Sequence, residues 1–359
     1  MTEQTTTMPA VDEAKVEEFL GQLVVDLGAT ASTLLTYVGD RLGLYAAMAG
    51  RPPMRPEELA EATGTNERMI REWLSAQAAS GYVTYDADSG TFSFPLEHAA
   101  ALAFDDSPAS VAGFVQALAA GYRNADLLVE AVRTGKGLGW GDHHHELFDG
   151  IARVTEPAMR AFLVDVWVAA LDGVTARLET GARVADVGCG YGASLCVLAD
   201  AFPASTFIGF DTHEASIDRA RQAAAAHDVT DRVSFEVATA VAYPTESFDL
   251  ICFFDSLHDM GDSLGAARHA RSAVAADGTV MVVEPIAGDR LEHNLNPLGR
   301  LLYSGSTIIC TPCSLDQDGP ALGAQAGPAR IRALLEQAGF SRVAQVAQTP
   351  FNYVLEARP

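Results

Sequence analysis

The sequence has few cysteines and few basic residues. Its 359 residues include five Cys, an odd number for a long chain, which argues against a disulfide framework and favours a reducing compartment. Lys and Arg together number 24 against 47 Asp and Glu, so the formal net charge is −23. Because such a field repels polyanions, nucleic acids and anionic lipid surfaces are disfavoured as partners.

Long hydrophobic runs are also missing. No uninterrupted apolar run reaches about 18 residues, so no transmembrane helix is predicted. The N-terminus is polar and acidic and lacks the basic start and apolar stretch of a signal peptide. Apolar residues still make up 48%, enough for a sizeable core, and the length fits about two domains. We therefore predict a soluble, acidic, cytoplasmic protein of two domains.

The first fifty residues combine a polar tail with a helical pattern. Residues 1–10 are predicted to be a disordered tail. From Val11 onward, apolar residues recur at three- and four-residue spacing, which indicates helices. Gly28 and Gly50 are the expected helix ends, because glycine often follows the last helical residue.

Residues 55–95 carry the pattern of a winged helix. A short helix begins at Pro56, a turn follows, and a second helix covers 67–80 with its apolar side inward. Two short β-prone runs separated by a turn then form a hairpin. This order of helix, turn, helix and hairpin predicts a mainly helical winged-helix domain over 11–100.

The charge of this predicted domain argues against DNA binding. Its second helix offers Arg68 and Arg71 but also Glu67 and Glu72. Over the first hundred residues about fifteen side chains are acidic and six are basic, whereas nucleic-acid modules usually show the reverse. We therefore expect a scaffold for dimerisation, since the N-terminal helices carry an apolar face with few charges.

From about residue 182, short apolar runs alternate with helical stretches. This alternation predicts an α/β domain over 181–359 with a mostly parallel sheet and helices on both faces, preceded by linking helices and a pocket loop over 101–180. Strands are predicted at 183–187, 206–210, 233–237, 248–254 and 279–283, and a C-terminal antiparallel hairpin at 342–348 and 352–356.

Glycines follow the first of these strands, and a helix follows them. They allow a tight turn and the close approach of a ligand, and the helix start presents free N–H groups. Asp186, two residues before Gly188, would repel a pyrophosphate and suits a cationic group. Asp211 ends the second strand, where an acid can accept both ribose hydroxyls. An adenosine with a positively charged tail, such as S-adenosylmethionine, fits both carboxylates better than NAD.

The order of these segments resembles that of class I S-adenosylmethionine-dependent methyltransferases. Residues 186–192 together with Asp211 resemble the first two motifs of that family. Residues 248–251, before Asp255, resemble its fourth strand, and residues 277–285 resemble its fifth strand. The resemblance implies a Rossmann-like sheet and S-adenosylmethionine as cofactor. Where many relatives have an Asp to contact the adenine, this chain has Thr239. The expected cofactor-binding residues are Asp186, Gly188, Cys189, Gly190, Asp211, Thr212, Ala238, Thr239, Phe254 and Asp255.

His258 follows the fourth strand, at the edge where ligands bind in this architecture. The stretch 255–262 resembles the His-Asp-Trp-Ser-Asp segment of small-molecule O-methyltransferases that carry an N-terminal winged helix. The resemblance implies that His258 is the general base for a hydroxyl group, a role that suits its ordinary pKa of about 6.5. Either Asp259 or Glu284 could orient the ring, and the sequence does not choose between them.

A wider resemblance, from about residue 30 to Pro359, links the chain to a group of bacterial winged-helix methyltransferases. It is carried by residues 140–148, 294–300 and 320–327 and implies the fold and cofactor, not the acceptor. Pocket walls are expected from 140–148 and 293–311. The candidate substrate-binding residues are Trp140, His143, His144, Phe148, His293, Asn296 and Tyr303.

The predicted function is methyl transfer to a small molecule, most simply to oxygen, by a homodimer without a metal. One alternative is a DNA-binding regulator that senses S-adenosylmethionine. Another is a metal-dependent C-methyltransferase acting on an α-keto acid, because His258 and Asp259 match a His-Asp pair of a phenylpyruvate C-methyltransferase. Cys310 and Cys313 form a CxxC pair that could be redox-active or half of a zinc site, although no second CxxC exists.

Overall fold

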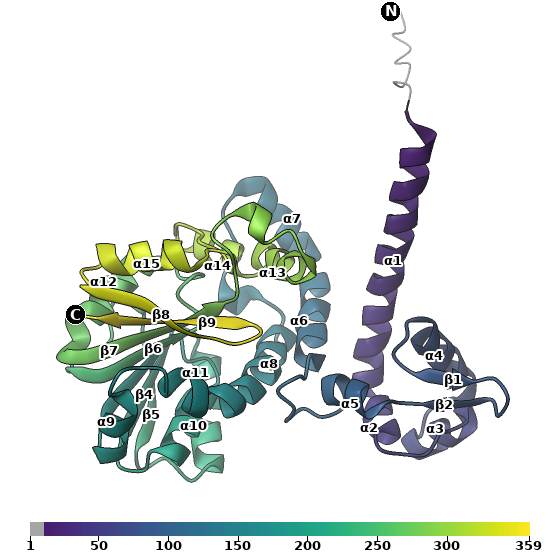
Figure 1. Cartoon of the computed structure of the whole chain (residues 1–359), viewed down its shortest axis with the longest axis horizontal. Coiled ribbons are helices and arrows are strands. Elements are labelled where there is room, and N and C mark those ends of the chain that lie inside the picture. Colours follow the sequence, from purple (N-terminus) through teal and green to yellow (C-terminus); the bar gives the residue numbers. More distant parts are fainter. Residues whose placement is uncertain (1–10) are drawn as a thin grey trace, which may run out of the picture. The chain divides into compact units, whose positions relative to one another are not determined.

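The computed structural model describes residues 11–359, and the predicted disordered tail lies outside the described residues. The chain divides into two compact units, Met1–Phe104 and Asp105–Pro359. Figure 1 labels their helices and strands. The division falls close to the boundary expected at residue 100, and the linking helices belong to the second unit.

The first unit contains the winged helix. Its elements are α1 (Glu13–Arg41), α2 (Leu44–Met48), α3 (Pro56–Thr63), α4 (Glu67–Ala79), β1 (Thr84–Asp86), β2 (Thr91–Ser93) and α5 (Leu96–Leu102). Asn66 caps α4 by accepting the N–H of Met69 at 3.1 Å. The ring of Trp73 on α4 packs edge-on against Tyr45, with centroids 5.1 Å apart. These contacts anchor the second helix of the motif in a small core.

Helix α1 is longer than expected because it continues through Gly28. Nothing lies within 4 Å of the position that a Cβ would take there, so packing neither requires nor forbids this glycine. One glycine in a helix costs only about 1 kcal/mol relative to alanine, and the long helix tolerates that cost. The expected helix end at Gly28 is therefore wrong, whereas Gly50 does follow α2 with a positive φ of 68°.

The exposed surface of α1 is unusually apolar. By length and composition α1 could span a membrane, and only 11% of its most apolar stretch is buried. No uninterrupted apolar run marks this helix in the sequence, because polar residues and glycines interrupt it. Asp26 lies near the middle of α1, where a bilayer core would disfavour its charge.

The second unit is built on a seven-stranded sheet with the order β5-β4-β3-β6-β7-β9-β8. Strands β3 to β7 are parallel, and β9 is antiparallel to both β7 and β8. The predicted mostly parallel sheet with a C-terminal hairpin is confirmed. The strands are β3 (Arg183–Val187), β4 (Thr206–Asp211), β5 (Val233–Val237), β6 (Phe248–Phe254), β7 (Val274–Pro285), β8 (Arg342–Gln348) and β9 (Asn352–Arg358).

Helices cover both faces of this sheet (Figure 1). Successive side chains of a strand point to opposite faces, so Phe253 packs with α12 and α15 while Phe254 packs with Trp167 on the other side. Burial on both faces explains why the strands read as continuous apolar runs. The helices are α6 (Ala112–Arg123), α7 (Ala125–Thr134), α8 (Glu146–Phe162), α9 (Val174–Thr180), α10 (Ala193–Ala201), α11 (Glu214–Ala226), α12 (Ser263–Ala273), α13 (Pro297–Ile308), α14 (Cys310–Asp316) and α15 (Pro328–Gln337).

The strand order reverses beside β3. From β3 the chain crosses to β4 and β5 on one side, and later to β6 and β7 on the other. In open α/β sheets a crevice forms at such a switch point, outside the carboxyl ends of the strands. The loops after β3, β4, β6 and β7 meet there, and they carry the chemistry-bearing residues of the sequence.

Candidate functional site

The loop between β3 and α10 contains three glycines with positive φ. Their φ angles are 80° at Gly188, 51° at Gly190 and 76° at Gly192, a backbone region that disfavours other residues. A Cβ on Gly188 would lie 2.7 Å from the Cβ of Ser256, and one on Gly192 would lie 2.5 Å from the ring of Phe235. At Gly190 nothing lies within 4 Å, so this peptide borders open space where a ligand can approach it.

Asp186 is buried at the end of β3 with only one of its carboxylate oxygens partnered. The hydroxyl of Ser194 donates a hydrogen bond to Oδ2, whereas Oδ1 has no hydrogen-bond partner among the described residues. Burial raises the pKa of this carboxyl to about 7, against the opposing effect of Ser194, and the nearby charge of Asp211 adds to the rise. An ammonium group would satisfy the orphaned oxygen and offset the desolvation cost, as expected for a cationic cofactor.

Asp211 joins the glycine loop to the loop after β4. Its Oδ2 accepts the N–H of Gly190 at 2.9 Å, and its Oδ1 accepts the N–H of His213 at 2.9 Å. A carboxylate has about four acceptor positions, so two remain for hydroxyl groups. The carboxylate is thus oriented before a ribose arrives, which fits the predicted anchoring role.

The remaining expected cofactor residues lie around the same crevice. The N–H of Ala238, after β5, donates to the carbonyl of Asp211 at 3.0 Å, while Thr212 and Thr239 are exposed. The side chains of Cys189 and Phe254 belong to the hydrophobic core, so only their backbones could face a ligand. Burial accordingly raises the pKa of the Cys189 thiol well above its ordinary value.

Asp255 begins the loop after β6 in a left-handed conformation with a φ of 48°. Asn352, at the start of β9, donates its amide to both carboxylate oxygens at 2.8 and 3.1 Å. The N–H of Asp255 also donates to the carbonyl of Val283 at 2.8 Å. Burial raises the pKa of Asp255 to about 7, with a further contribution from Glu284. These contacts fix the start of the loop that carries His258.

His258 and Glu284 form a buried pair at the carboxyl ends of β6 and β7. The two side chains are only 3% and 2% exposed, and Nδ1 of His258 is hydrogen-bonded to Oε2 of Glu284. The structure thus places Glu284, not Asp259, on the ring. Asp259 stays nearby with its pKa raised to about 7, chiefly by burial. A carboxylate on Nδ1 fixes the tautomer and leaves Nε2 to exchange a proton, as in hydrolase triads.

The pKa of His258 reflects two opposing effects. Burial alone would lower it, because a charged imidazolium loses hydration. The negative charge of Glu284, together with Cys310, outweighs burial and raises the pKa of His258 well above its ordinary value. The charge of Glu284 therefore favours the protonated form of this ring.

The segment from η1 (Trp140–Asp142) to the start of α8 brings aromatic side chains to this edge of the sheet. Phe148 packs against Trp140, with centroids 5.2 Å apart, and against His213, 4.8 Å away. Tyr191 of the glycine loop and Ile309 pack against the same cluster. Four elements distant in sequence thus form one apolar wall beside the cofactor loops.

The neighbouring histidines have different surroundings. His143 is buried, with Nδ1 3.1 Å from the amide of Asn124 and Nε2 3.8 Å from Sγ of Cys313. Burial lowers its pKa. His144 is half-buried, and its Nε2 lies 2.9 Å from the guanidinium of Arg123. The expected role of His143 and His144 in acceptor binding stays a prediction.

The other expected acceptor residues lie on or before α13. His293 is exposed, with Nε2 3.0 Å from Arg290, and Tyr303 is half-buried. Asn296 caps α13 by accepting the N–H of Gly299 at 2.8 Å, which gives it a structural role already. Within residues 11–359, no hydrogen bond, ion pair or ring contact joins these three side chains to the aromatic wall.

Several residues of the site escaped the sequence analysis. Tyr191 donates its hydroxyl to Asp149 at 3.0 Å, which ties the glycine loop to α8. Asn352 lies 97 positions from its partner Asp255. Such pairs leave no signal in local spacing.

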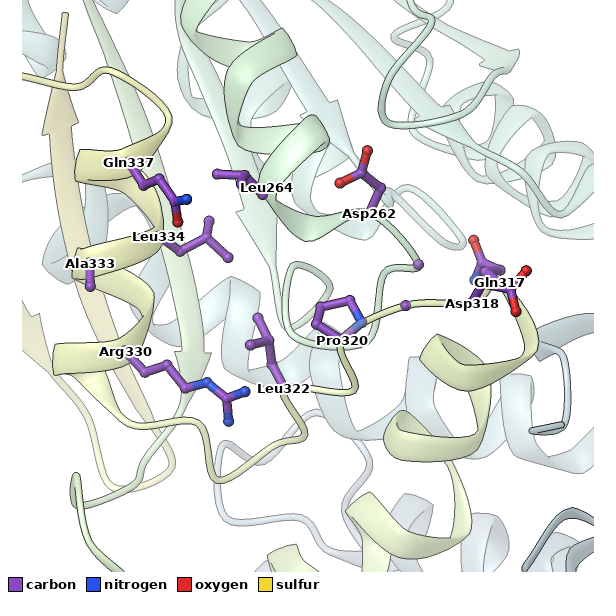
Figure 2. Close-up of a pocket in the computed structure, with 12 residues that line it drawn as sticks. Asp262, Leu264, Gln317, Asp318, Pro320, Leu322, Arg330, Ala333, Leu334 and Gln337 are labelled. Carbon is purple, nitrogen blue, oxygen red and sulfur yellow. The ribbon is translucent and has the colours of Figure 1, made fainter. Parts of the chain in front are cut away.

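Figure 2 shows a separate pocket of about 710 Å³. It lies between the start of α12, the segment after α14 and one side of α15, and its lining contains none of Asp186, Asp211 and His258. Leu264, Leu322 and Leu334 form its apolar part, and Asp262 and Arg330 contribute charges. Among the described residues, no group of three or more His, Cys, Asp or Glu side chains could hold a metal ion.

Comparisons with known proteins match both units of the chain to domain families. Residues 30–103 match the family described as the Rv2258c-like winged HTH domain, and residues 178–339 match a methyltransferase domain family. The chain has 30% identity over 182 residues with 27-O-demethylrifamycin SV methyltransferase of Amycolatopsis mediterranei, covering 50% of this chain and 57% of that protein. It has 31% identity over 153 residues with the chloroplastic tocopherol O-methyltransferase of Arabidopsis thaliana. That match covers 40% of this chain and 44% of the relative. The chain thus spans about half the length of these curated relatives.

Solved structures resemble the chain over almost its whole length. Mitomycin 7-O-methyltransferase superposes with a TM-score of 0.71 and 21% identity, covering 97% of this chain and 99% of that one. Human N-acetylserotonin methyltransferase in complex with S-adenosylmethionine superposes with a TM-score of 0.66 and 19% identity. The superposition covers 98% of this chain and 99% of that one. At such identities the likeness concerns the fold.

The fold and the cofactor crevice define the class, a winged-helix protein with a class I methyltransferase domain. By this domain content the chain carries a winged-helix domain and a methyltransferase domain, and the predicted fold class is confirmed.

Proposed function

We propose that the protein transfers a methyl group from S-adenosylmethionine to an oxygen atom of a small planar acceptor, with His258 as general base. The observation that carries this proposal is the buried pair of His258 and Glu284 at the same edge as the glycine loop. The relatives that are O-methyltransferases by name support the choice of oxygen.

The proposed chemistry needs alignment and one proton acceptor. When bound, S-adenosylmethionine supplies the methyl group on a positively charged sulfur, which is a good leaving group. Nε2 of His258 takes the hydroxyl proton as the oxygen attacks, and Glu284 stabilises the imidazolium that results. Asp186 and Asp211 hold the two ends of the cofactor, so much of the acceleration comes from orientation.

An aromatic acceptor fits the apolar wall. Trp140, Phe148, Tyr191 and Ile309 offer flat or branched apolar surfaces beside the cofactor loops. His143, His144, His293, Asn296 and Tyr303 are proposed as further contacts around this wall. Flat apolar contacts would orient a ring without fixing its substituents, so the acceptor class we propose is a phenol or hydroxylated heterocycle.

A screen of phenols, carboxylic acids, amines and α-keto acids tests this proposal directly. The measurement is release of S-adenosylhomocysteine by the full chain. We expect turnover with at least one phenol and identification of the product as an aryl methyl ether. Turnover confined to amines, or a carbon-methylated keto acid as the only product, would contradict it.

The pKa of Asp186 gives a prediction about cofactor affinity. Because its pKa is raised to about 7, the carboxyl is mostly neutral at pH 6 and mostly ionised at pH 7.5. A cationic ligand prefers the ionised form, so affinity for S-adenosylmethionine should rise by up to about tenfold over this range. Titration calorimetry measures it, with Asp186→Asn as the matched variant. The variant should bind more weakly, and its affinity should lack this rise. An equal pH dependence in both proteins would disprove the role of Asp186.

The winged helix lacks the features of a DNA reader. On α4, Arg68 is paired with Glu72 at 2.6 Å, and Arg71 is paired with Glu57 at 3.3 Å and with Glu67. The arginines expected to face a phosphate backbone are therefore committed to acidic neighbours. This pairing supports a structural role for the domain.

We further propose that the domain forms a homodimer through α1 and that the protein is cytoplasmic. Phe19 and Leu27 on α1 are 61% and 60% exposed. The same helix continues into an apolar groove of about 540 Å³ against α4, which Leu35, Val38 and Trp73 help to line. An apolar surface of this extent on a soluble protein usually marks an interface. Asp26 disfavours a bilayer as the alternative cover.

Charges placed on this surface should separate the dimer. The double variant Leu20→Asp, Leu27→Asp introduces two carboxylates on the apolar side of α1, whereas Gln22→Asp puts one on the opposite side. Sedimentation analysis should show a dimer for the natural chain and for Gln22→Asp, and a monomer for the double variant. A monomeric natural chain, or one that binds neutral lipid vesicles, would contradict the proposed interface.

A further inference from the structure

His213 lies where the loop after β4 meets the aromatic wall. It is the residue before α11, and its backbone N–H donates to Oδ1 of Asp211 at 2.9 Å. Its imidazole ring packs against the ring of Phe148 on α8, with centroids 4.8 Å apart. A single residue thus contacts both the carboxylate that we assign to the ribose and the wall that we assign to the acceptor.

Two further contacts hold the half-buried ring of His213 in place. Nδ1 lies 2.8 Å from Oγ of Ser216, a buried side chain in the first turn of α11. Cδ2 lies beside η1, where a Cβ on Gly141 would be in van der Waals contact at 3.7 Å. Because the rotamer of a side chain depends on the φ and ψ angles of its own residue, a fixed ring also restricts the direction of the backbone N–H. The packing of the ring therefore helps to aim this N–H at Asp211.

Phe148 is held by a close crossing of two helices. The main chains of α6 and α8 meet so closely that a Cβ on Gly113 would lie 2.4 Å from the carbonyl oxygen of Gly150. In the other direction, a Cβ on Gly150 would lie 2.7 Å from the carbonyl oxygen of Gly113. Only glycine allows this approach. Phe148, two residues before Gly150, is 8% exposed. Its place against His213 is therefore set by the helix pair and not by the loop after β4.

We propose that His213 is a positioning residue that couples the acceptor site to the cofactor site. The contact with Phe148 keeps the N–H of His213 on Oδ1 of Asp211, and so keeps the carboxylate oriented for the ribose hydroxyls. A planar acceptor that packs on the wall confines Phe148 further and strengthens this orientation. The place of the acceptor rests on the proposed function. By thermodynamic linkage, acceptor and cofactor then raise each other's affinity by the same factor.

A double-mutant cycle tests this coupling through cofactor affinity alone. The Kd for S-adenosylhomocysteine is measured by titration calorimetry, without any acceptor, for the natural full chain, Phe148→Leu, His213→Ala and the double variant. Leucine is chosen because it leaves an apolar side chain in a buried position. A contact between two rings is worth about three- to tenfold in an equilibrium constant, so each single variant should raise the Kd by about that factor. The Kd of the double variant should stay within about twofold of the higher single value, because either change removes the same contact.

Two further variants separate positioning from a general loss of packing. Phe340→Leu makes the same substitution at a side chain that is 4% exposed and lies between α15 and β8, so it should leave the Kd unchanged. His213→Phe keeps a ring against Phe148, and it should recover most of the affinity that His213→Ala loses.

Several results would overturn the coupling. An effect of Phe148→Leu that is equal with and without the His213 side chain would show that Phe148 acts on the nucleoside directly. An unchanged Kd in Phe148→Leu, an equal loss in Phe340→Leu, or no recovery in His213→Phe would also contradict the proposal. Failure of the natural chain to bind S-adenosylhomocysteine would overturn the cofactor assignment together with the coupling. Failure of every phenol in the acceptor screen would leave these binding data intact, so the coupling and the proposed methyl transfer fail separately.

Discussion

Replacement of His258 by alanine is expected to lower kcat for a phenolic acceptor by about 10²- to 10⁴-fold, the usual contribution of a positioned base. Its Nδ1 is committed to Glu284 inside the protein, and no bulk water can substitute for a ring that is 3% exposed. Affinity for S-adenosylmethionine should stay within about twofold, because Asp186 and Asp211 lie on other strands. Steady-state kinetics and calorimetry measure both quantities.

His227→Ala is the matched control, since this histidine pairs with Asp200 at 2.9 Å near the surface. It should leave kcat unchanged. Equal kcat for His258→Ala and the natural chain with an oxygen nucleophile would remove the assignment of the base.

The raised pKa of His258 also gives the sign of the pH dependence. A base must be unprotonated, so kcat should rise with pH until the raised pKa of His258 is passed and then level off. Glu284→Gln removes the charge that raises this pKa, so the rising part of the profile should move to lower pH. A profile that does not move, or moves to higher pH, would contradict the role of Glu284.

The second large effect is expected at Asp211. Asp211→Ala removes the proposed acceptor of two ribose hydroxyl groups, and it also removes the acceptor of the N–H groups of Gly190 and His213. A hydrogen bond to a charged group contributes about 1.5–3 kcal/mol, so loss of one such bond should raise the Kd for S-adenosylmethionine by about 10-fold to about 150-fold, and loss of both should raise it further. Asp211→Asn keeps part of the acceptor capacity, so its Kd for S-adenosylmethionine should lie between those of the natural chain and Asp211→Ala.

The control for this variant is a surface acid of the same unit. Asp218 on α11 is exposed and pairs with Arg221 at 3.0 Å, so Asp218→Ala removes a similar charge without touching the crevice. Its Kd should match that of the natural chain. If Asp211→Ala binds the cofactor as tightly as Asp218→Ala does, the ribose does not rest on this carboxylate.

The sheet was predictable because its strands are buried on both faces. Residues 183–187, 233–237 and 248–254 were predicted with the same ends as β3, β5 and β6. Strand β7 is longer than the predicted 279–283 because Val274 already pairs with Phe248 before a register shift. That irregular pairing depends on the neighbouring strand and leaves no trace in local hydrophobicity.

The proximity of the two proposed cofactor carboxylates could be predicted for a similar reason. The ends of β3 and β4 are adjacent in space because parallel strands end at one edge, so Asp186 and Asp211 could be expected at one crevice from their positions in the sequence. The choice between Asp259 and Glu284 could not be made, because it depends on how far β7 extends beside β6.

Only part of the surface character of the winged-helix unit could be predicted from the sequence. The excess of acidic residues was visible in the sequence, but the ion pairs that occupy Arg68 and Arg71 required the structure. Conversely, the apolar surface of α1 was visible only in part, because Asp26 and two glycines interrupt the run that a sequence search would detect. Its exposure becomes evident once the helix is seen to continue to Arg41.

Selection of the nucleoside by Asp186 and Asp211 is the central claim, and titration calorimetry tests it most directly. S-adenosylmethionine, S-adenosylhomocysteine and NADH are each titrated into the full chain under the same conditions. We predict saturable binding of the first two and no measurable binding of NADH, whose pyrophosphate would meet the carboxylate of Asp186. Tight binding of NADH with no heat from S-adenosylmethionine would contradict the account.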